Sequence, residues 1–387
     1  MIYLDHNATT PIRPEVLDAM LPFLQEQYGN PSSVYALGQA SRRALEEARA
    51  ETARLIGAAS PDEIVFTSCG SESDVFAVMG AAYEAFESSG GVKNQIITTS
   101  IEHEAIISCA RLLKRRGFET LFLPVDGQAA VSAGAVEEAL SERTALVSVM
   151  HANNEVGTIQ AVEPMARRCR ERGVLFHTDA VQSVGKIPVN VEKMGVSLLS
   201  LSGHKLNAPK GVGALYVRRG ARLQPLITGN YEKFRRGGTL NVASIVGLGA
   251  ACRLIRTEGE RHAQEWARMR ERLVEGILAE VPDSHLSGDP VNCLPNTVHF
   301  CLEGIDGHNL VVALDMKGAA VSSGAACSSG AAEPSHVLKA MGISSDWVRG
   351  ALRISLGWGN QPQEIEAFLK MLPPAVDKLR AANRISR

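Results

Sequence analysis

The sequence predicts an α/β fold with a mostly parallel sheet and helices on both of its faces. Short runs of apolar, often β-branched residues alternate with stretches of helical periodicity through the first part of the chain. Polar or ionisable residues directly follow several of these apolar runs. Alternation of this kind is typical of sheets built from strand–helix–strand units, in which ligands bind beyond the carboxyl ends of the strands.

The elements of the predicted large sheet follow in order. Strands are expected at residues 63–67, 95–99, 120–123, 145–150 and 174–178, then in an apolar run that starts at 196 and leads to Lys205, and at 213–217. Helices are expected at 15–27, 34–56, 75–86, 106–116, 136–140 and 164–172, with a polar, glycine-containing turn at 68–74.

The pattern changes after residue 216, and a smaller α+β part is predicted from residue 286. An irregular, basic, glycine-rich loop at 228–239 leads to a long helical stretch at 243–281, interrupted near 257–259. Strands are then expected at 296–302, 319–323 and 352–356, and helices at 308–316, 334–341 and 362–379, the last kinked at Pro373 and Pro374. The predicted domains are an N-terminal arm at 1–14, a large domain at 15–255 and a small domain at 256–387.

The composition is that of an ordinary soluble globular protein. The 387 residues are 45% hydrophobic and 21% charged, with a net charge of −2 and no long charged block, which argues against nucleic-acid or membrane partners. No signal pattern or bilayer-spanning run is present. Seven scattered cysteines without C-x-x-C spacing argue against disulfides or a metal site. We therefore expect a cytoplasmic protein without a bound metal.

Lys205 is the most informative of the residues that follow an apolar run. A lysine next to a strand built for burial is unfavourable unless it is neutralised or paired. A lysine that condenses with an aldehyde cofactor meets this condition, because desolvation lowers the pKa of its amine and makes it a nucleophile. The alternative is a lysine that reaches solvent at the end of the strand.

Four more polar residues are expected at the same edge of the sheet. His103, Asn154, Asp179 and Gln182 each lie at or just beyond the end of a predicted strand, as Lys205 does. Each could separately be a helix cap or a hydrogen-bonded core residue. Because the carboxyl ends of parallel strands meet at one edge, together they predict a ligand site.

This set of residues suits pyridoxal phosphate. Asp179 would keep the pyridine nitrogen protonated, so that the ring can accept electrons. His103 could stack on the ring or transfer protons, and Gln182 and Asn154 could hydrogen-bond to the ring hydroxyl. The residues expected to hold the phosphate are Gly70, Ser71, Ser202 and His204.

Several motifs are spread along the chain. They are Asp5-His-Asn-Ala-Thr-Thr-Pro11, Tyr28-Gly-Asn-Pro-Ser-Ser33, Ala152-Asn-Asn-Glu155, His177-Thr-Asp-Ala-Val-Gln182, Ser202-Gly-His-Lys205, Arg236-Gly-Gly-Thr239 and Ser322-Ser-Gly-Ala-Ala-Cys-Ser-Ser-Gly330. These motifs resemble those of the cysteine desulfurases, and the turn at 67–74 is most similar to the NifS-like branch of that family. The resemblance extends from residue 4 to about residue 357, in the order found in the family.

The resemblance implies the type I fold of pyridoxal-phosphate enzymes and a homodimer in which Thr239 reaches the phosphate bound by the neighbouring subunit. It also implies that Arg353, Asn154 and Asn7 bind the substrate, with Arg353 and Asn154 on its carboxylate. Lys205 would move the proton of the substrate Cα, with His103 as a further catalytic residue. Cys327, in a serine- and glycine-rich loop expected to be exposed and mobile, would take the sulfur of L-cysteine as a persulfide. The sulfur would then pass to an iron–sulfur scaffold or another acceptor protein.

The chain departs from the family pattern at a few positions. His6 stands where asparagine is usual, Gly70-Ser71 replaces Ala-Thr, Ala325 replaces serine, and residues 228–234 differ from the usual loop.

Two kinds of alternative function remain. One is another enzyme of the same fold, such as a selenocysteine lyase or an aminotransferase, and the other is a non-catalytic scaffold for iron–sulfur assembly.

Overall fold

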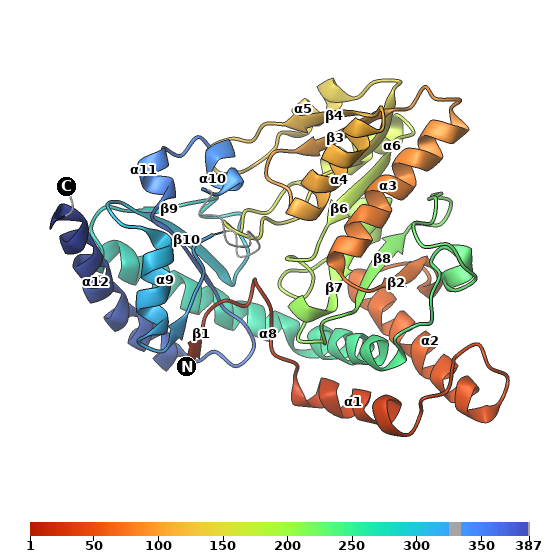
Figure 1. The fold of residues 1–387 in the computed structure, drawn as a ribbon, viewed down its shortest axis with the longest axis horizontal. Coiled ribbons are helices and arrows are strands. Elements are labelled where there is room, and N and C mark those ends of the chain that lie inside the picture. Colours follow the sequence, from red (N-terminus) through yellow and green to blue (C-terminus); the bar gives the residue numbers. More distant parts are fainter. Residues whose placement is uncertain (325–333, 386–387) are drawn as a thin grey trace.

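A seven-stranded sheet with helices on both faces forms the larger part of the molecule, and a three-stranded sheet forms the smaller part (Figure 1). The structure is a computed structural model that describes residues 1–324 and 334–385. Helix α8 (Val242–Glu280) runs along both parts. The predicted α/β class is confirmed.

The large sheet has the strand order β2-β8-β7-β6-β5-β3-β4. Strands β3 to β7 are parallel to their neighbours within this set, whereas β8 is antiparallel to both β2 and β7. Most of the sheet is therefore parallel, as predicted. The strands are β2 (Ile64–Thr67), β3 (Gln95–Thr99), β4 (Glu119–Leu123), β5 (Thr144–Ser148), β6 (Leu175–Asp179), β7 (Leu198–Ser202) and β8 (Gly213–Val217).

The helices of the larger part agree with the sequence pattern except at α3 and at the short helix α7, which the sequence did not predict. They are α1 (Pro14–Gln25), α2 (Ala36–Ile56), α3 (Gly70–Ser88), α4 (Glu104–Arg115), α5 (Ala133–Ala139), α6 (Val162–Glu171) and α7 (Val191–Met194), with 3₁₀ turns η1 (Pro61–Glu63), η2 (Gly203–Lys205) and η3 (Glu232–Phe234). The polar turn expected at 68–74 is mostly the start of α3, because Cys69 Sγ accepts a hydrogen bond from the Glu72 N–H (3.4 Å) and caps the helix.

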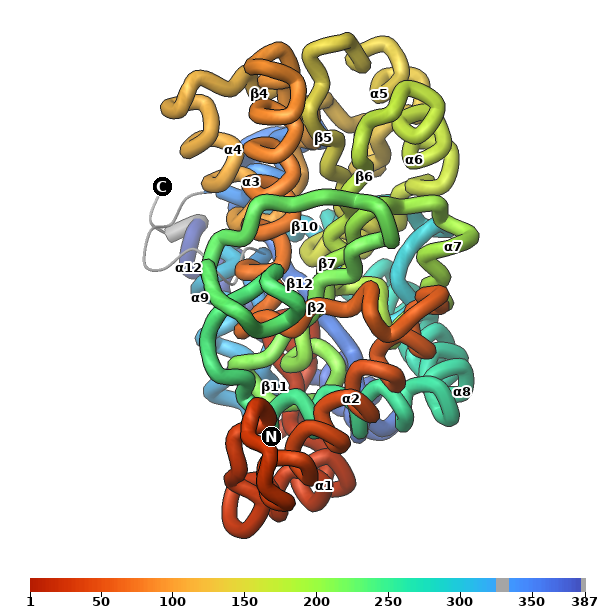
Figure 2. Tube along the Cα trace, turned by 90° about the vertical axis from the view of Figure 1, so that its right-hand side faces the viewer, coloured from red at the N-terminus to blue at the C-terminus, as the bar shows by residue number. Residues whose placement is uncertain are grey.

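Figure 2 faces the long connection between β8 and α8, residues 218–241. Helix α8 is continuous, so the interruption expected near 257–259 is wrong. Within the helix the Thr257 hydroxyl donates to the Leu254 carbonyl (3.0 Å). The helix packs on both hydrophobic cores, through Leu248 in the larger part and Leu273 in the smaller. This packing outweighs the weak local signal of a glycine.

In the smaller part, β10 (Thr297–Leu302) pairs antiparallel with β12 (Ala351–Ser355) and with β9 (Ser284–Leu286), a strand that the sequence did not predict. The helices are α9 (Gly307–Asp315), α10 (His336–Ala340), α11 (Ser345–Val348) and α12 (Pro362–Ile385), which continues through both prolines. The strand expected at 319–323 is reduced to β11 (Ala319–Ala320).

The N-terminal arm joins the two parts. Strand β1 (Ile2–Tyr3) pairs in parallel with β11, and Leu4 is buried in the core of the smaller part. The chain then crosses to α1 at the bottom of the larger part (Figure 1). The predicted domain boundary between residues 255 and 256 falls inside α8 and stays a prediction.

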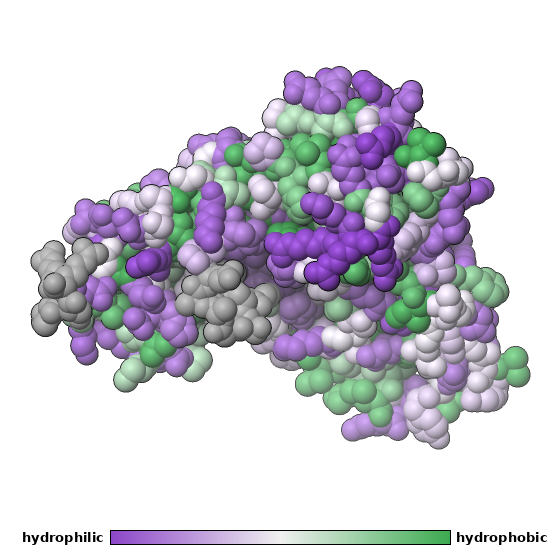
Figure 3. Space-filling model, turned by 45° about the horizontal axis from the view of Figure 1, so that its top comes forward, coloured by the Kyte–Doolittle hydropathy of each residue, from purple (hydrophilic) through white to green (hydrophobic). Residues whose placement is uncertain are grey.

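The surface is mixed, with hydrophobic patches among the hydrophilic side chains (Figure 3). Some of the exposed apolar residues follow helical spacing on α1, namely Leu17, Leu21 and Leu24. Within residues 1–324 and 334–385, no helix is long and apolar enough to cross a membrane.

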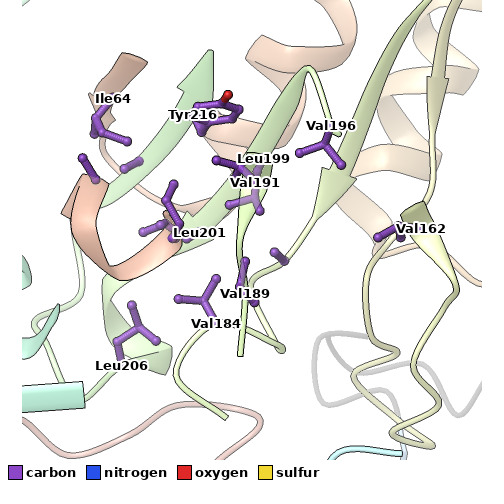
Figure 4. Close-up of a cluster of buried hydrophobic side chains, with 14 of the residues drawn as sticks. Ile64, Val162, Val184, Val189, Val191, Val196, Leu199, Leu201, Leu206 and Tyr216 are labelled. Atoms are coloured by element: carbon purple, nitrogen blue, oxygen red, sulfur yellow. The ribbon is translucent and has the colours of Figure 1, made fainter. Parts of the chain in front are cut away.

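A large apolar cluster holds one face of the sheet against its helices (Figure 4). Leu199 and Leu201 of β7 point into it together with Val184 and Leu206, which flank the ligand edge of β6 and β7. Because a strand alternates its faces, Leu198 belongs to the core cluster on the opposite face. This two-sided burial keeps the strand ends rigid where polar residues emerge.

Candidate active site

The residues predicted to form a ligand site lie beyond the carboxyl ends of parallel strands. Asp179 ends β6, and Lys205 ends the 3₁₀ turn that follows β7. His103 is the N-cap of α4 after β3, and its Nδ1 accepts a hydrogen bond from the Ala105 N–H (3.2 Å). The sheet therefore brings these side chains to one edge.

The amine of Lys205 is held by the N-terminal arm. Lys205 Nζ donates to the backbone carbonyls of Asn7 and Ala8, the second at 2.6 Å. Gln182 Nε2 donates to the same Asn7 carbonyl (3.0 Å). Two of the predicted cofactor residues thus converge on one backbone oxygen of the arm.

Asp179 is a buried carboxylate in a cationic setting. Burial raises the pKa of Asp179, while His103 and Lys205 act in the opposite direction and favour its charged form. Asp74 of α3 is buried nearby, and its burial together with the charge of Asp179 raises the pKa of Asp74 well above its usual range. Burial thus favours the protonated form of both carboxyls, and only Asp179 has His103 and Lys205 as opposing charges.

A small polar cradle lies where α3 begins. The Ser202 hydroxyl is buried and has no hydrogen-bond partner among the described residues. A Cβ on Gly70, the first residue of α3, would stand 3.6 Å from Ser202 Oγ and 3.0 Å from a methyl group of Val181. Ser71 is exposed beside it. Helix N–H groups and an unpaired hydroxyl at one point suit an anion such as a phosphate.

His204 faces the arm. Its Nδ1 lies 3.2 Å from Thr9 Oγ1. Burial, followed by the charges of Lys205 and other neighbours, lowers the pKa of His204 to about 4, so the ring is neutral near pH 7. Thr239 is exposed on this chain, and its predicted role in a second subunit stays a prediction.

Arg353 of β12 brings a guanidinium to the site from the smaller part. It is 1% exposed, Nη2 donates to Asp5 Oδ1 (2.7 Å), and Nη1 donates to the Asn154 carbonyl (3.1 Å). Its Nε has no hydrogen-bond partner among the described residues. A buried arginine with a free donor on its fork is suited to a carboxylate ligand.

Asn7 links the predicted carboxylate residues. Its Nδ2 donates to Thr297 Oγ1 (2.9 Å) and to the Asn154 carbonyl (3.2 Å), and its Oδ1 accepts from Asn296 Nδ2 (3.2 Å). The Asn7 amide is thus already bonded to protein on both ends. Its predicted role in binding substrate stays a prediction.

Cys327 and Ala325 lie outside the described residues. Of the described cysteines, four are buried, and burial raises their thiol pKa values to about 12 (Cys109, Cys169, Cys252) and about 11 (Cys301). Thiols with such pKa values are poor nucleophiles at neutral pH.

Three buried residues near the site were missed from the sequence. Lys186 donates to Asn7 Oδ1 and to Gln182 Oε1, and Glu102 is buried beside the loop after β5, where its Oε1 accepts from the Met150 N–H (3.0 Å). Asp74 is the third. A lysine within the apolar run 184–189 was a usable signal, whereas nothing local shows that Glu102 and Asp74 are buried.

Two of the positions that depart from the family pattern are buried and contact other parts of the chain. His6 is buried edge-to-face against Tyr3, with ring centroids 4.9 Å apart, and occupies space beside Gly357 that a Cβ there would need. In the loop at 228–234, Glu232 is buried and forms a two-point ion pair with Arg49 of α2.

Comparison with known proteins decides the family. Residues 2–368 match the model of the family described as aminotransferase class-V. The chain belongs to the class-V aminotransferase family. Its relatives include the cysteine desulfurase IscS of Methanosarcina thermophila and the cysteine desulfurase NifS of Azotobacter vinelandii. Each is 44% identical over 98% of this chain and 93% of the relative.

Solved structures agree with this assignment. A NifS-like protein superposes with a TM-score of 0.90 at 38% identity, covering 98% of this chain and all of that one. The structure titled SspA in complex with cysteine has a TM-score of 0.81 at 35% identity, covering 92% of this chain and 99% of the other. The predicted type I fold of pyridoxal-phosphate enzymes is therefore confirmed.

Class-V aminotransferases use pyridoxal phosphate, and the residues present here fit that group. The unpaired Ser202 hydroxyl at the start of α3 suits its phosphate. The buried carboxylate of Asp179 suits its ring nitrogen, and Lys205 supplies the amine. The described residues thus offer groups suited to the phosphate, the ring nitrogen and the aldehyde of this cofactor.

Proposed function

We propose that this chain is a pyridoxal-phosphate-dependent cysteine desulfurase. It converts L-cysteine to L-alanine and transfers the sulfur to Cys327 as a persulfide. The relatives named cysteine desulfurase, at 42–45% identity over nearly the whole chain, support the reaction. The observation that carries the proposal is the buried Arg353 guanidinium with an unpaired Nε, on the strand facing the Lys205 edge.

Each residue of the site has a proposed part. Arg353, with Asn154 beside it, binds the α-carboxylate, because a guanidinium can bind a carboxylate through two parallel hydrogen bonds. Lys205 removes the proton from Cα, and His103 transfers protons near it. When bound, pyridoxal phosphate accepts the electron pair that this deprotonation releases.

Further residues hold the cofactor. Asp179 keeps its ring nitrogen protonated, and Gln182 and Asn154 donate to its ring hydroxyl. The phosphate lies in the cradle formed by Gly70, Ser71, Ser202 and His204, completed by Thr239 of a second subunit.

The sulfur transfer is a displacement at sulfur. The Cys327 thiolate attacks the substrate sulfur, so a sulfur–sulfur bond forms as the Cβ–S bond breaks. The electron pair of the broken bond stays on the carbon side and is protonated, which yields the methyl group, and Lys205 returns a proton to Cα to complete alanine. The persulfide then passes its sulfur to an acceptor protein.

The assembly is proposed to be a homodimer. The apolar face of α1 exposes Leu17, Leu21 and Leu24, whose side chains are 44%, 38% and 59% exposed. A second copy would cover such apolar positions. We propose that the dimer acts in the cytoplasm and supplies an iron–sulfur scaffold. The nitrogenase pathway is one candidate, since a relative is named NifS.

The test uses reduced, cofactor-loaded protein supplied with L-cysteine. Alanine and sulfide are measured together for the wild type, Lys205→Ala and Cys327→Ala. We expect equal amounts of both products from the wild type, no turnover by Lys205→Ala and loss of sulfide by Cys327→Ala. Cys293→Ala, at a described cysteine of intermediate exposure, is the matched control and should stay active.

Two results would contradict the proposal. A fully active Cys327→Ala would exclude the persulfide step. A yellow wild-type protein that forms neither product from cysteine would show another substrate, and selenocysteine and ordinary amino donors would then be tried.

A further inference from the structure

Lys186 is a buried lysine whose side chain ends between two amides of the site. It is 5% exposed and lies in the turn after β6. Its Nζ donates to Asn7 Oδ1 (2.8 Å) and to Gln182 Oε1 (2.5 Å), both of which are neutral oxygens. Burial, reinforced by the charges of Lys205 and Arg353, lowers the pKa of Lys186 well below its usual range.

A buried amine is an unfavourable choice for a position that only needs to be filled. A methionine would occupy a similar volume without the free-energy cost of removing an ammonium or amine from water. What lysine adds here is hydrogen-bond donors aimed at two acceptors at once.

These donors fix the orientation of both amides. Because each amide carries one oxygen and one NH₂ group, an oxygen that accepts from Lys186 leaves the NH₂ pointing elsewhere. Gln182 Nε2 donates to the Asn7 backbone carbonyl (3.0 Å), and Asn7 Nδ2 donates to Thr297 Oγ1 (2.9 Å). A rotation of either amide would break these bonds together with its bond to Lys186.

The same contacts connect the arm to Lys205. The Asn7 backbone carbonyl accepts from both Gln182 and Lys205, while the Asn7 side chain is held by Lys186 from the larger part and by Asn296 from the smaller. Lys186 thus supports the residue that contacts the amine of Lys205.

We propose that Lys186 is a positioning residue that fixes the Gln182 amide and anchors Asn7 of the N-terminal arm around Lys205. The inference rests on the proposed cofactor site. Through the Gln182 orientation, Lys186 determines that an NH₂ group, and not an oxygen, is available to the ring hydroxyl of pyridoxal phosphate. Through Asn7, it holds residues 1–14 against the larger part.

The first measurement needs no turnover. Hydrogen–deuterium exchange of the apoprotein is compared for the wild type, Lys186→Met and Lys193→Met. Lys193 is an exposed lysine on α7 and serves as the matched control. We expect backbone amides near Asn7 to exchange at least tenfold faster in Lys186→Met, with the core strands and the control unchanged. Equal exchange near Asn7 in all three proteins would refute the anchoring.

The second measurement is a spectroscopic titration of the same apoproteins with pyridoxal phosphate. In Lys186→Met the released Gln182 amide can turn its oxygen to the ring hydroxyl, so we expect a shifted visible absorption band and a dissociation constant raised at least tenfold. Lys186→Arg keeps the donors and should keep the band of the wild type. An unshifted band with unchanged affinity in Lys186→Met would overturn the proposal.

The arginine variant also keeps the test decisive if Lys186→Met does not fold. Lys186→Arg keeps the hydrogen-bond donors, so a shifted visible absorption band in a folded Lys186→Arg would equally refute the donor role. Neither readout depends on the substrate. A wild type that binds the cofactor but does not act on cysteine would refute the proposed function and leave this inference standing.

Discussion

Replacing Arg353 by lysine tests the role of its guanidinium in binding substrate. The arginine donates through Nη1 and Nη2, to Asn154 and Asp5, and its Nε is unpaired among the described residues. Lysine keeps the positive charge but can offer a carboxylate one hydrogen bond where the planar fork offers two. A hydrogen bond to a charged group contributes about 1.5–3 kcal/mol.

This loss corresponds to about a 10- to 150-fold decrease in kcat/KM, since about 1.4 kcal/mol equals a factor of ten. The α-carboxylate does not change during the reaction, so the lost bond weakens substrate and transition state alike. We therefore expect a higher KM and a kcat within about threefold of the wild type.

The assay is alanine formation over a range of L-cysteine concentrations, with thermal unfolding to verify the fold. Arg349→Lys is the matched control, because Arg349 is an exposed arginine four positions earlier in the chain and should show wild-type kinetics. A KM for Arg353→Lys within twofold of the wild type would refute the reasoning. So would a large fall in kcat at unchanged KM, because it would place Arg353 in the chemical step.

Three further predictions concern stability. Gly357→Ala should lower the free energy of unfolding by about 1–3 kcal/mol, because its Cβ would overlap the buried His6 ring, and His6→Ala should relieve most of this loss. Glu232→Gln should lower it by about 3–5 kcal/mol, because it leaves Arg49 buried without its carboxylate. Burial raises the pKa of Glu102 to about 8, so between pH 5 and pH 8 the folded state keeps a proton that the unfolded state loses. The free energy of unfolding of the wild type should therefore fall as the pH rises from 5 to 8. It should fall less in Glu102→Gln, which has no carboxyl at this position.

Urea unfolding measures all three, each with a matched control. A Cβ on Gly127 would come no closer than 3.9 Å to the Met341 carbonyl oxygen, and Glu46→Gln removes the exposed partner of Arg49. Gly127→Ala and Glu46→Gln should therefore each change stability by less than about 0.5 kcal/mol. Glu104→Gln, at an exposed glutamate, should keep the pH dependence of the wild type. Variants that match their controls would contradict the corresponding prediction.

The sequence by itself determined the sheet and its ligand edge. Apolar runs alternating with helical stretches are local patterns, and the polar residues that follow them can only emerge at the carboxyl ends of parallel strands. Lys205, Asp179 and His103 were predicted for that reason, and the structure places them at this edge. Local patterns failed where capping and packing decide, at the start of α3 and in the unbroken α8.

Only the tertiary structure decided which polar residues are buried and which atoms they contact. Lys186 meets Asn7 across 179 positions of the chain, and Arg353 meets Asp5 across 348. No local pattern encodes such contacts, because they depend on how the arm crosses between two separately built cores. The free-energy cost of burying a charge also arises only after folding has removed water from around these side chains. This cost is the reason that buried lysine, arginine and carboxyl side chains indicate a functional site.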